Sequence, residues 1–244
     1  MAELYDTIGR DYRSHRRPEP RIAAAIVAAL GPAESVINVG AGAGSYEPTG
    51  RRVVAVEPSL EMIRQRHPEA APVVRASAGD LPFADGAADA ALAVLTIHHW
   101  PDRARGLAEL ARVARRRVVI LTWDPGTYGF WLVEDYFPEI VAVDRGLFPT
   151  LADFTAALGP VEVRPLPIPH DCRDGFLGAY WRRPRAYLDA GVRLAISTFS
   201  KIDAEPGLAR LRSDLESGDW QRRHGAVLAA TELDLGYRLV VRTL

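Results

Sequence analysis

The chain has 244 residues, of which 48% are hydrophobic and 25% are charged, and its formal net charge is −1. This composition excludes an intrinsically disordered chain, and no apolar run reaches the roughly 18 residues of a transmembrane helix. A single cysteine, Cys172, excludes an intrachain disulfide framework. The near-neutral charge disfavours nucleic acid as a partner. Residues 1–17 lack the apolar segment of a signal peptide, so we expect one cytoplasmic domain with no membrane association.

Short apolar runs alternate with helical patterns in the first two-thirds of the chain, which predicts βαβ units and a parallel sheet. The predicted strands span residues 35–39, 52–56, 73–76, 87–97 and 118–121. The predicted helices span residues 21–30, 60–66 and 102–115. Asp102 is the expected N-cap of the last of these helices, and residues 115–117, all arginine, are expected to close its C-terminus.

The pattern changes after residue 122, where aromatic residues become frequent. We predict a helix at 151–158, a strand at 161–168, a mainly helical segment at 169–230 and a last strand at 233–243. The whole chain, 1–244, then forms one domain with a core of about 20–122, 159–168 and 232–244. The segments 123–150 and 169–230 form a cap that shapes a substrate pocket. The candidate substrate-binding residues are the aromatic residues Trp123, Tyr128, Trp131 and Tyr180.

A glycine-rich turn follows the first predicted strand, with glycines at positions 40, 42 and 44. Glycines there let the backbone turn tightly and approach a ligand closely. Glu57 ends the second predicted strand, where a carboxylate can accept hydrogen bonds from both hydroxyls of a ribose. A dinucleotide-binding loop would have glycine or alanine where this chain has Ser45. The pattern therefore indicates an adenosine-containing cofactor.

Two further motifs narrow the prediction. Residues 78–86 read AGDLPFADG, and residues 95–102 read LTIHHWPD. Together with the glycine loop, these motifs resemble the class I S-adenosylmethionine-dependent methyltransferases, in particular the small-molecule enzymes of the ubiquinone and menaquinone type. The resemblance covers about residues 5–122, and residues 235–240 resemble the last strand of that fold. It implies an α/β, Rossmann-like three-layer sandwich with a seven-stranded, mostly parallel sheet that contains one antiparallel strand.

The resemblance also implies which residues bind S-adenosylmethionine and its product S-adenosylhomocysteine. They lie in the N-terminal segment and at the ends of the predicted strands, and they are Tyr12, Arg17, Gly40, Ala41, Gly42, Glu57, Pro58, Ser77, Ala78 and Thr96. Among these, Glu57 is expected to hold the ribose hydroxyls, and Ser77 replaces an acidic residue that the family often has. Tyr12 is expected to act as a lid, and Arg17 to meet a carboxylate.

The implied reaction is methyl transfer to a small-molecule acceptor with an O, N or C nucleophile, by in-line displacement at the sulfonium methyl. We expect the acceptor to belong to secondary metabolism. A hydroxyl acceptor needs a base, and His98, His99 and His170 are the candidates. No cluster has the spacing of a zinc site, so we expect no metal. We expect the protein to be a monomer or homodimer.

Two alternatives from other classes remain. Asn38 stands where the family usually has an acidic residue, which keeps open a non-catalytic, cofactor-binding relative of the fold. The glycine loop alone also fits an NAD(P)-dependent oxidoreductase, although Ser45 and the two later motifs count against it. The arginines at 115–117 and 182–185 suggest a nucleic-acid methyltransferase, which the balanced charge disfavours.

Overall fold

The computed structural model describes residues 16–124, 126–127 and 129–244. Seven strands form one sheet in the order β3-β2-β1-β4-β5-β9-β6. In chain order they are β1 (Ser35–Val39), β2 (Arg52–Val56), β3 (Val73–Val74), β4 (Ala88–Val94), β5 (Ala114–Trp123), β6 (Glu162–Pro165) and β9 (Tyr237–Thr243). The strands β1 to β5 run parallel to one another, and β9 runs antiparallel to both β5 and β6. This confirms the predicted seven-stranded sheet with one antiparallel strand.

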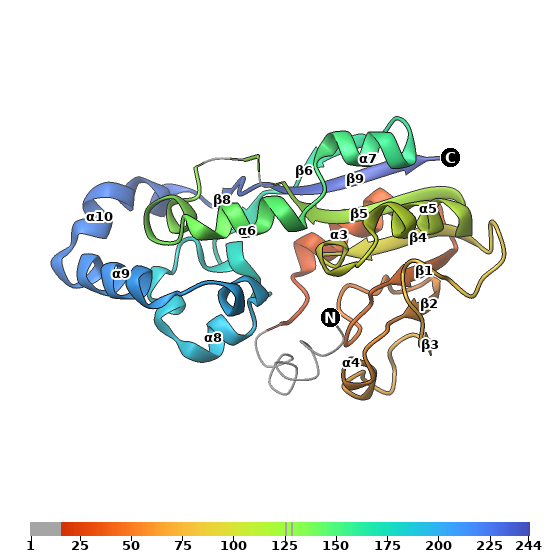
Figure 1. The fold of residues 1–244 in the computed structure, drawn as a ribbon, viewed down its shortest axis with the longest axis horizontal. Helices are drawn as coiled ribbons and strands as arrows, with labels where there is room; N and C mark the ends of the chain where they lie inside the picture. Colours follow the sequence, from red (N-terminus) through yellow and green to blue (C-terminus); the bar gives the residue numbers. More distant parts are fainter. Residues whose placement is uncertain (1–15, 125, 128) are drawn as a thin grey trace.

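Alternate residues of each central strand point to opposite faces of the sheet, and both faces are covered by helices. Val36 of β1 packs with Ile22 and Ile26 of α3 (Pro20–Leu30). Its neighbour Ile37 belongs to the core on the other face, with Leu110 of α5 (Arg103–Val113) and with α7 (Leu151–Leu158). The result is a three-layer sandwich, and Figure 1 shows α5 and α7 lying side by side along β4, β5 and β9.

The direction of the strand order reverses at β1, because β2 lies on one side of it and β4 on the other. The loops that follow β1 and β4 therefore leave the sheet in different directions. In open parallel sheets, a reversal of this kind leaves a crevice at the carboxyl ends of the strands. The short helix α4 (Leu60–Arg64) follows β2 at this edge. This arrangement places the glycine loop and the end of β4 on either side of one crevice.

The second part of the chain forms short helices beyond one end of the sheet (Figure 1). They are a π-helical turn (Leu132–Tyr136), α6 (Glu139–Leu147), α8 (Ala190–Leu194), α9 (Glu205–Ser217) and α10 (Asp219–His224). A two-stranded sheet of β7 (Ile168–Pro169) and β8 (Glu232–Leu233) joins them to the main sheet. The aromatic side chains of this part merge with the core beneath α3, so the two parts share one hydrophobic interior.

Several predicted boundaries are wrong. The strand predicted at 87–97 ends at Val94, because Leu95 has a φ of 49° and Ile97–His99 form a 3₁₀ turn. The helix predicted to reach residue 115 ends at Val113, and the three arginines at 115–117 belong to β5 instead of capping a helix.

The two last predicted strands are each broken in two. Pro167, which has no N–H to donate, separates β6 from β7. Gly236, with a φ of +88°, separates β8 from β9, and a Cβ there would lie 2.9 Å from the carbonyl oxygen of Asp124. In the part of the chain that the structure describes, no helix is long and apolar enough to cross a membrane.

We predict opposite effects for two helical glycine substitutions. In Gly207→Ala, the new Cβ would lie 2.3 Å from the Tyr136 carbonyl oxygen, so α9 must shift and unfolding should become easier by about 1–3 kcal/mol. In Gly146→Ala, the Cβ meets nothing within 4 Å, so helix propensity should stabilise the protein by up to about 1 kcal/mol. Urea denaturation measures the free energy of unfolding of both variants. If both substitutions changed it in the same direction, the packing of α9 on residues 132–136 would be contradicted.

Candidate functional site

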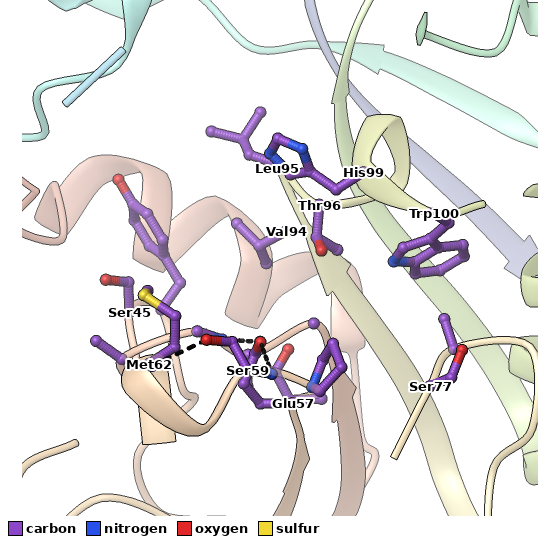
Figure 2. A pocket seen from close by; sticks show the side chains of 18 of the residues that line it. Ser45, Glu57, Ser59, Met62, Ser77, Val94, Leu95, Thr96, His99 and Trp100 are labelled. Carbon is purple, nitrogen blue, oxygen red and sulfur yellow. Dashed lines mark hydrogen bonds between the residues drawn. The ribbon is translucent and has the colours of Figure 1, made fainter. Parts of the chain in front are cut away.

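A cavity of about 210 Å³, here called cavity 1, lies at the carboxyl ends of β1, β2 and β4. Figure 2 shows Glu57, Ser59 and Met62 on one side of it and Val94, Thr96 and His99 on the other. Its lining comes from Arg16, the glycine loop and its flanks (Asn38, Gly40, Ala41, Gly42, Ala43, Ser45, Tyr46), residues 57–59, Met62, Ser77, Ala78 and residues 94–96 and 99–101.

The carboxylate of Glu57 links the two loops that form one wall of cavity 1. The backbone amide of Gly42 donates to Oε2 at 2.8 Å, and that of Ser59 donates to Oε1 at 2.9 Å. Burial raises the pKa of the Glu57 carboxyl, while the two amide bonds oppose that effect. A carboxylate has about four lone-pair sites, so further hydroxyl donors can still bind to it.

The glycine at position 40 is required by a close approach between two loops. Gly40 has a φ of +71°, and a Cβ there would lie 2.1 Å from the Thr96 hydroxyl oxygen. The amides of Gly40 and Ala41 both donate to the carbonyl oxygen of Val56, at 2.8 and 3.0 Å. A side chain at position 40 would therefore push the glycine loop away from the end of β4.

Asn38 is the polar side chain of β1 that faces cavity 1. It is 1% exposed, and neither its amide nitrogen nor its amide oxygen has a hydrogen-bond partner among the described residues. Leaving a buried amide without partners costs free energy. An unpartnered donor and acceptor at the wall of a cavity are therefore groups that a bound ligand can satisfy.

A second cavity of about 70 Å³, here called cavity 2, adjoins cavity 1. Arg16, Leu95 and His99 line both. The rest of its lining is mainly apolar and aromatic, and it consists of His98, Trp123, Asp144, Phe148, Phe176, Leu177, residues 195–198 and Tyr237. Most of these residues come from the second part of the chain, so the two parts of the fold enclose cavity 2 together.

The two adjacent histidines are poorly suited to act as bases. The ring of His98 stacks on Phe148 at 4.3 Å, and burial lowers its pKa well below the ordinary value. Burial also lowers the pKa of His99 to about 3. Both rings are therefore neutral at physiological pH and have little affinity for a proton. His170, the third candidate, lies next to β7 and does not line either cavity.

Asp144 of α6 is the acidic side chain in the lining of cavity 2. It is 2% exposed, and the hydrogen bond described for its carboxylate is a long one of 3.4 Å from the Thr198 hydroxyl. Burial raises the pKa of Asp144 to about 7, and the nearby Lys201 ammonium opposes that shift. No arginine or lysine among the described residues forms an ion pair with it. The carboxyl group is thus poised to exchange a proton near neutral pH.

A buried polar network connects the N-terminal segment, the glycine loop and the second part of the chain. Asp174, 1% exposed, accepts from Arg16 Nε at 2.6 Å and from the Tyr46 hydroxyl at 2.8 Å. The Tyr46 oxygen in turn accepts from the Glu19 amide, and Glu19 accepts from the amide of Arg173. This network holds Arg16 at the junction of the two cavities.

The structure brings most of the predicted cofactor-binding residues together. Those that line cavity 1 are Gly40, Ala41, Gly42, Glu57, Pro58, Ser77, Ala78 and Thr96. Arg17 is exposed and lines a neighbouring surface hollow, while the adjacent Arg16 lines cavity 1. Tyr12 lies outside the described residues, so its role as a lid stays a prediction.

The predicted substrate-binding aromatics are spread over different places. Trp123 lines cavity 2 and donates its indole N–H to the Leu235 carbonyl oxygen. Trp131 is buried in the interior, where it donates to the Trp181 carbonyl oxygen and does not line either cavity. Tyr180 is half-buried beneath the Arg183 guanidinium. Tyr128 lies outside the described residues.

Sequence reasoning missed Asp144, Arg16 and Trp100, all of which line the cavities. A signal for Asp144 does exist: it follows the buried Ile140 by four residues, so a carboxylate lies on the apolar stripe of a helix. Nothing local distinguishes Arg16 from Arg17. The described residues contain no group of His, Cys, Asp and Glu arranged to hold a metal ion.

Two other motifs have structural roles. Burial raises the pKa of the Cys172 thiol to about 12, so it is not a thiolate nucleophile. Arg183 donates to the carbonyl oxygens of Cys172 and Ala179, at 2.7 and 2.8 Å. These bonds give Arg183 a structural role in holding the turns around Cys172 and Ala179.

Asp144 should make the free energy of unfolding of the wild type fall as the pH rises, and Asp144→Asn should remove that effect. The group ionises near pH 3.8 in the unfolded chain and near 7 when folded, so the folded state binds the extra proton between these values. The free energy of unfolding of the variant, minus that of the wild type, should rise by about 2–4 kcal/mol from about pH 4 to 7. Urea denaturation at several pH values measures it. With the exposed Asp203→Asn as control, a constant difference would contradict the prediction.

Comparisons with known proteins agree with this architecture. A family model of the methyltransferase domain matches residues 37–122. A crystal structure of a candidate methyltransferase from an antibiotic biosynthesis pathway of Anabaena variabilis is 34% identical in sequence, with a TM-score of 0.86. That alignment covers 94% of this chain and 99% of the other chain.

Two curated relatives extend the comparison. An uncharacterised protein of Mycobacterium tuberculosis is 29% identical over 204 residues, which span 68% of this chain and 74% of that protein. A demethylmenaquinone methyltransferase of Corynebacterium kroppenstedtii is 34% identical over 136 residues, which span 47% of this chain and 55% of that enzyme. With the sheet order, the glycine loop and Glu57 already in place, these similarities show that the chain belongs to the S-adenosylmethionine-dependent methyltransferases.

Proposed function

We propose that this protein transfers the methyl group of S-adenosylmethionine to a small-molecule acceptor by in-line displacement. The observation that carries the proposal is the junction of two cavities at the carboxyl ends of β1, β2 and β4. Cavity 1 has polar groups that suit the cofactor, and cavity 2, which is lined largely by aromatic and aliphatic side chains, adjoins it at Leu95 and His99. In this proposal the second part of the chain serves as the acceptor-binding cap.

The residues of cavity 1 fit the cofactor's chemical groups. The Glu57 carboxylate, already oriented by two backbone amides, has lone pairs left for the two ribose hydroxyls. The unpartnered amide of Asn38 offers an acceptor for an ammonium and a donor for a carboxylate. Asn38 brings no charge, so it contributes a neutral hydrogen bond where the family usually has an ionic one.

In this reaction the protein's main tasks are to position the cofactor and the acceptor and to exclude water from them. The bound cofactor supplies an electrophilic methyl group on a sulfonium. The glycine loop and Glu57 hold one end of the ligand against the end of β4, where Thr96 lies. The buried aromatic side chains of cavity 2, such as Trp123 and Phe176, keep water from the acceptor and orient it.

The acceptor's place in metabolism is part of the same proposal. The A. variabilis protein is assigned to an antibiotic biosynthesis pathway, and the alignment covers nearly all of both chains. The second part of this chain, which lines most of cavity 2, is included in that coverage. This similarity supports an acceptor from secondary metabolism.

Isothermal titration calorimetry with three ligands tests the proposal. S-adenosylmethionine and S-adenosylhomocysteine should bind with micromolar affinity, and NADH should not compete with them. Binding of NADH instead would favour the oxidoreductase alternative. No heat from either sulfur compound at millimolar concentration would contradict the proposal, and binding of the cofactor without methyl transfer to any acceptor would favour the non-catalytic alternative.

Asn38→Ala should separate ligand binding from folding. The amide has no partner in the described part of the chain, so its removal should leave stability unchanged or increase it by up to about 1 kcal/mol. Affinity for S-adenosylhomocysteine should fall about tenfold, because a ligand hydrogen bond in a buried site is lost. Thermal denaturation and calorimetry measure the two effects. A variant that is destabilised but binds normally would show that Asn38 serves the fold instead.

A further inference from the structure

We propose that Asp144 is the general base of the reaction and that the acceptor carries a hydroxyl or amino nucleophile on a compact apolar body. The inference deepens the proposed function, on which it rests, and it assigns cavity 2 to the reacting end of the acceptor. The observation behind it is a buried carboxylate, without an ion pair among the described residues, on the wall of a largely aromatic cavity that joins cavity 1.

The burial of Asp144 is only weakly compensated, by a long hydrogen bond from Thr198 and by the nearby Lys201 ammonium. A buried carboxylate is normally paired with a cation or held by several donors, because the unpaired charge is costly to desolvate. Asp144 has instead one long hydrogen bond from Thr198, and it forms no ion pair with any described residue. The neighbouring helix surface is apolar, so an apolar residue at this position would pack without that cost. A ligand with a donor group explains why a carboxylate is there.

The other polar groups around cavity 2 do not compete for this role. His98 and His99 are held neutral by burial and bind protons weakly. Arg16 is a cation engaged with Asp174, and Lys201 is an exposed cation near Asp144. Among the described residues that line cavity 2, one further titratable side chain is the Tyr237 hydroxyl, whose oxygen accepts from the Gly178 amide and whose pKa burial raises.

Proton transfer and methyl transfer involve only Asp144, the acceptor and the cofactor. Asp144 takes the proton of the acceptor's O–H or N–H while a lone pair on that atom forms the new bond to the methyl carbon. The carbon–sulfur bond breaks, and its electron pair stays on sulfur. The neutral carboxyl group then returns its proton to solvent, which needs no further reactant because its pKa lies near 7.

The carboxylate also determines which acceptors are disfavoured. A carboxylate acceptor would bring a second negative charge against Asp144 in a cavity of low polarity. An acceptor without a donor hydrogen would leave Asp144 unpaired and gain nothing from it. A hydroxyl or an amino group meets both requirements, because it brings no negative charge and carries a donor hydrogen. Binding of probes that carry one group or the other distinguishes the two.

The experiment measures binding of small probes to the protein saturated with S-adenosylhomocysteine, by ligand-observed NMR titration at pH 8. Phenol and aniline carry the two donor groups, fluorobenzene has the same shape without a donor, and benzoate carries a carboxylate. Phenol, aniline or both should bind at least about fivefold more tightly than fluorobenzene, and benzoate should bind most weakly. The stronger of the two donors identifies the class of acceptor.

Variants then attribute the preference to Asp144. In Asp144→Ala the preference over fluorobenzene should disappear, and in Asp144→Asn, which keeps an acceptor oxygen of the same shape, it should fall to about twofold. Phenol affinity should rise between pH 6 and 8 in the wild type and stay constant in Asp144→Asn, because phenol itself ionises only near pH 10. Asp203→Asn, on the exposed surface of the same part of the chain, should behave as the wild type.

The outcomes are distinguishable from those of the proposed function. S-adenosylhomocysteine should bind all four proteins equally, and its failure to bind the wild type would overturn the proposed function itself. If it binds, the present inference is overturned by any of three results: a donor preference that survives in Asp144→Ala, benzoate that binds as well as phenol, or no saturable binding of any probe.

Discussion

The bonds of the Glu57 carboxylate to the amides of Gly42 and Ser59 are the contacts on which cavity 1 depends. They tie the loop after β1 to the start of α4, so two segments that leave the sheet in different directions become one wall. The opposite wall is the end of β4, and it lies close because Gly40 has no side chain to meet Thr96. A ligand that binds Glu57 is thereby brought against β4, where the second cavity begins.

The second part of the chain encloses cavity 2 through buried contacts with the first part. Asp174 joins Arg16 and Tyr46 across this boundary, and both partners line cavity 1. The aromatic interior around Trp131 stabilises the short helices of this part, which would be marginal alone. The contacts that hold the second part of the chain therefore also determine the position of Asp144 relative to the glycine loop.

The arginine-rich composition also has a structural explanation in several places. Lys201 is the only lysine, so nearly every basic residue is an arginine. Arg51 donates to the carbonyl oxygens of Ala33 and Gly31, and Arg117 donates to that of Ala29 near the end of α3. A guanidinium reaches two or three acceptors at once, which an ammonium on a lysine stem does less precisely. These arginines satisfy carbonyl groups at helix and loop ends, so their number does not indicate an anionic partner.

The sequence by itself determined the parallel strands, the glycine loop and Glu57 as a strand-end carboxylate. Each is recognised from a local pattern: apolar runs that alternate with helical patterns, a run of glycines, and an acidic residue at the end of a strand. It misplaced the end of β4 at Ile97 instead of Val94, and it misassigned the arginines at 115–117, since strand ends depend on neighbouring strands. Only the tertiary structure decided that Asp144 faces the site, that His98 and His99 are desolvated, and that Trp131 is interior. Burial and cavity lining arise from residues far apart in the chain, and no local pattern records which of them meet.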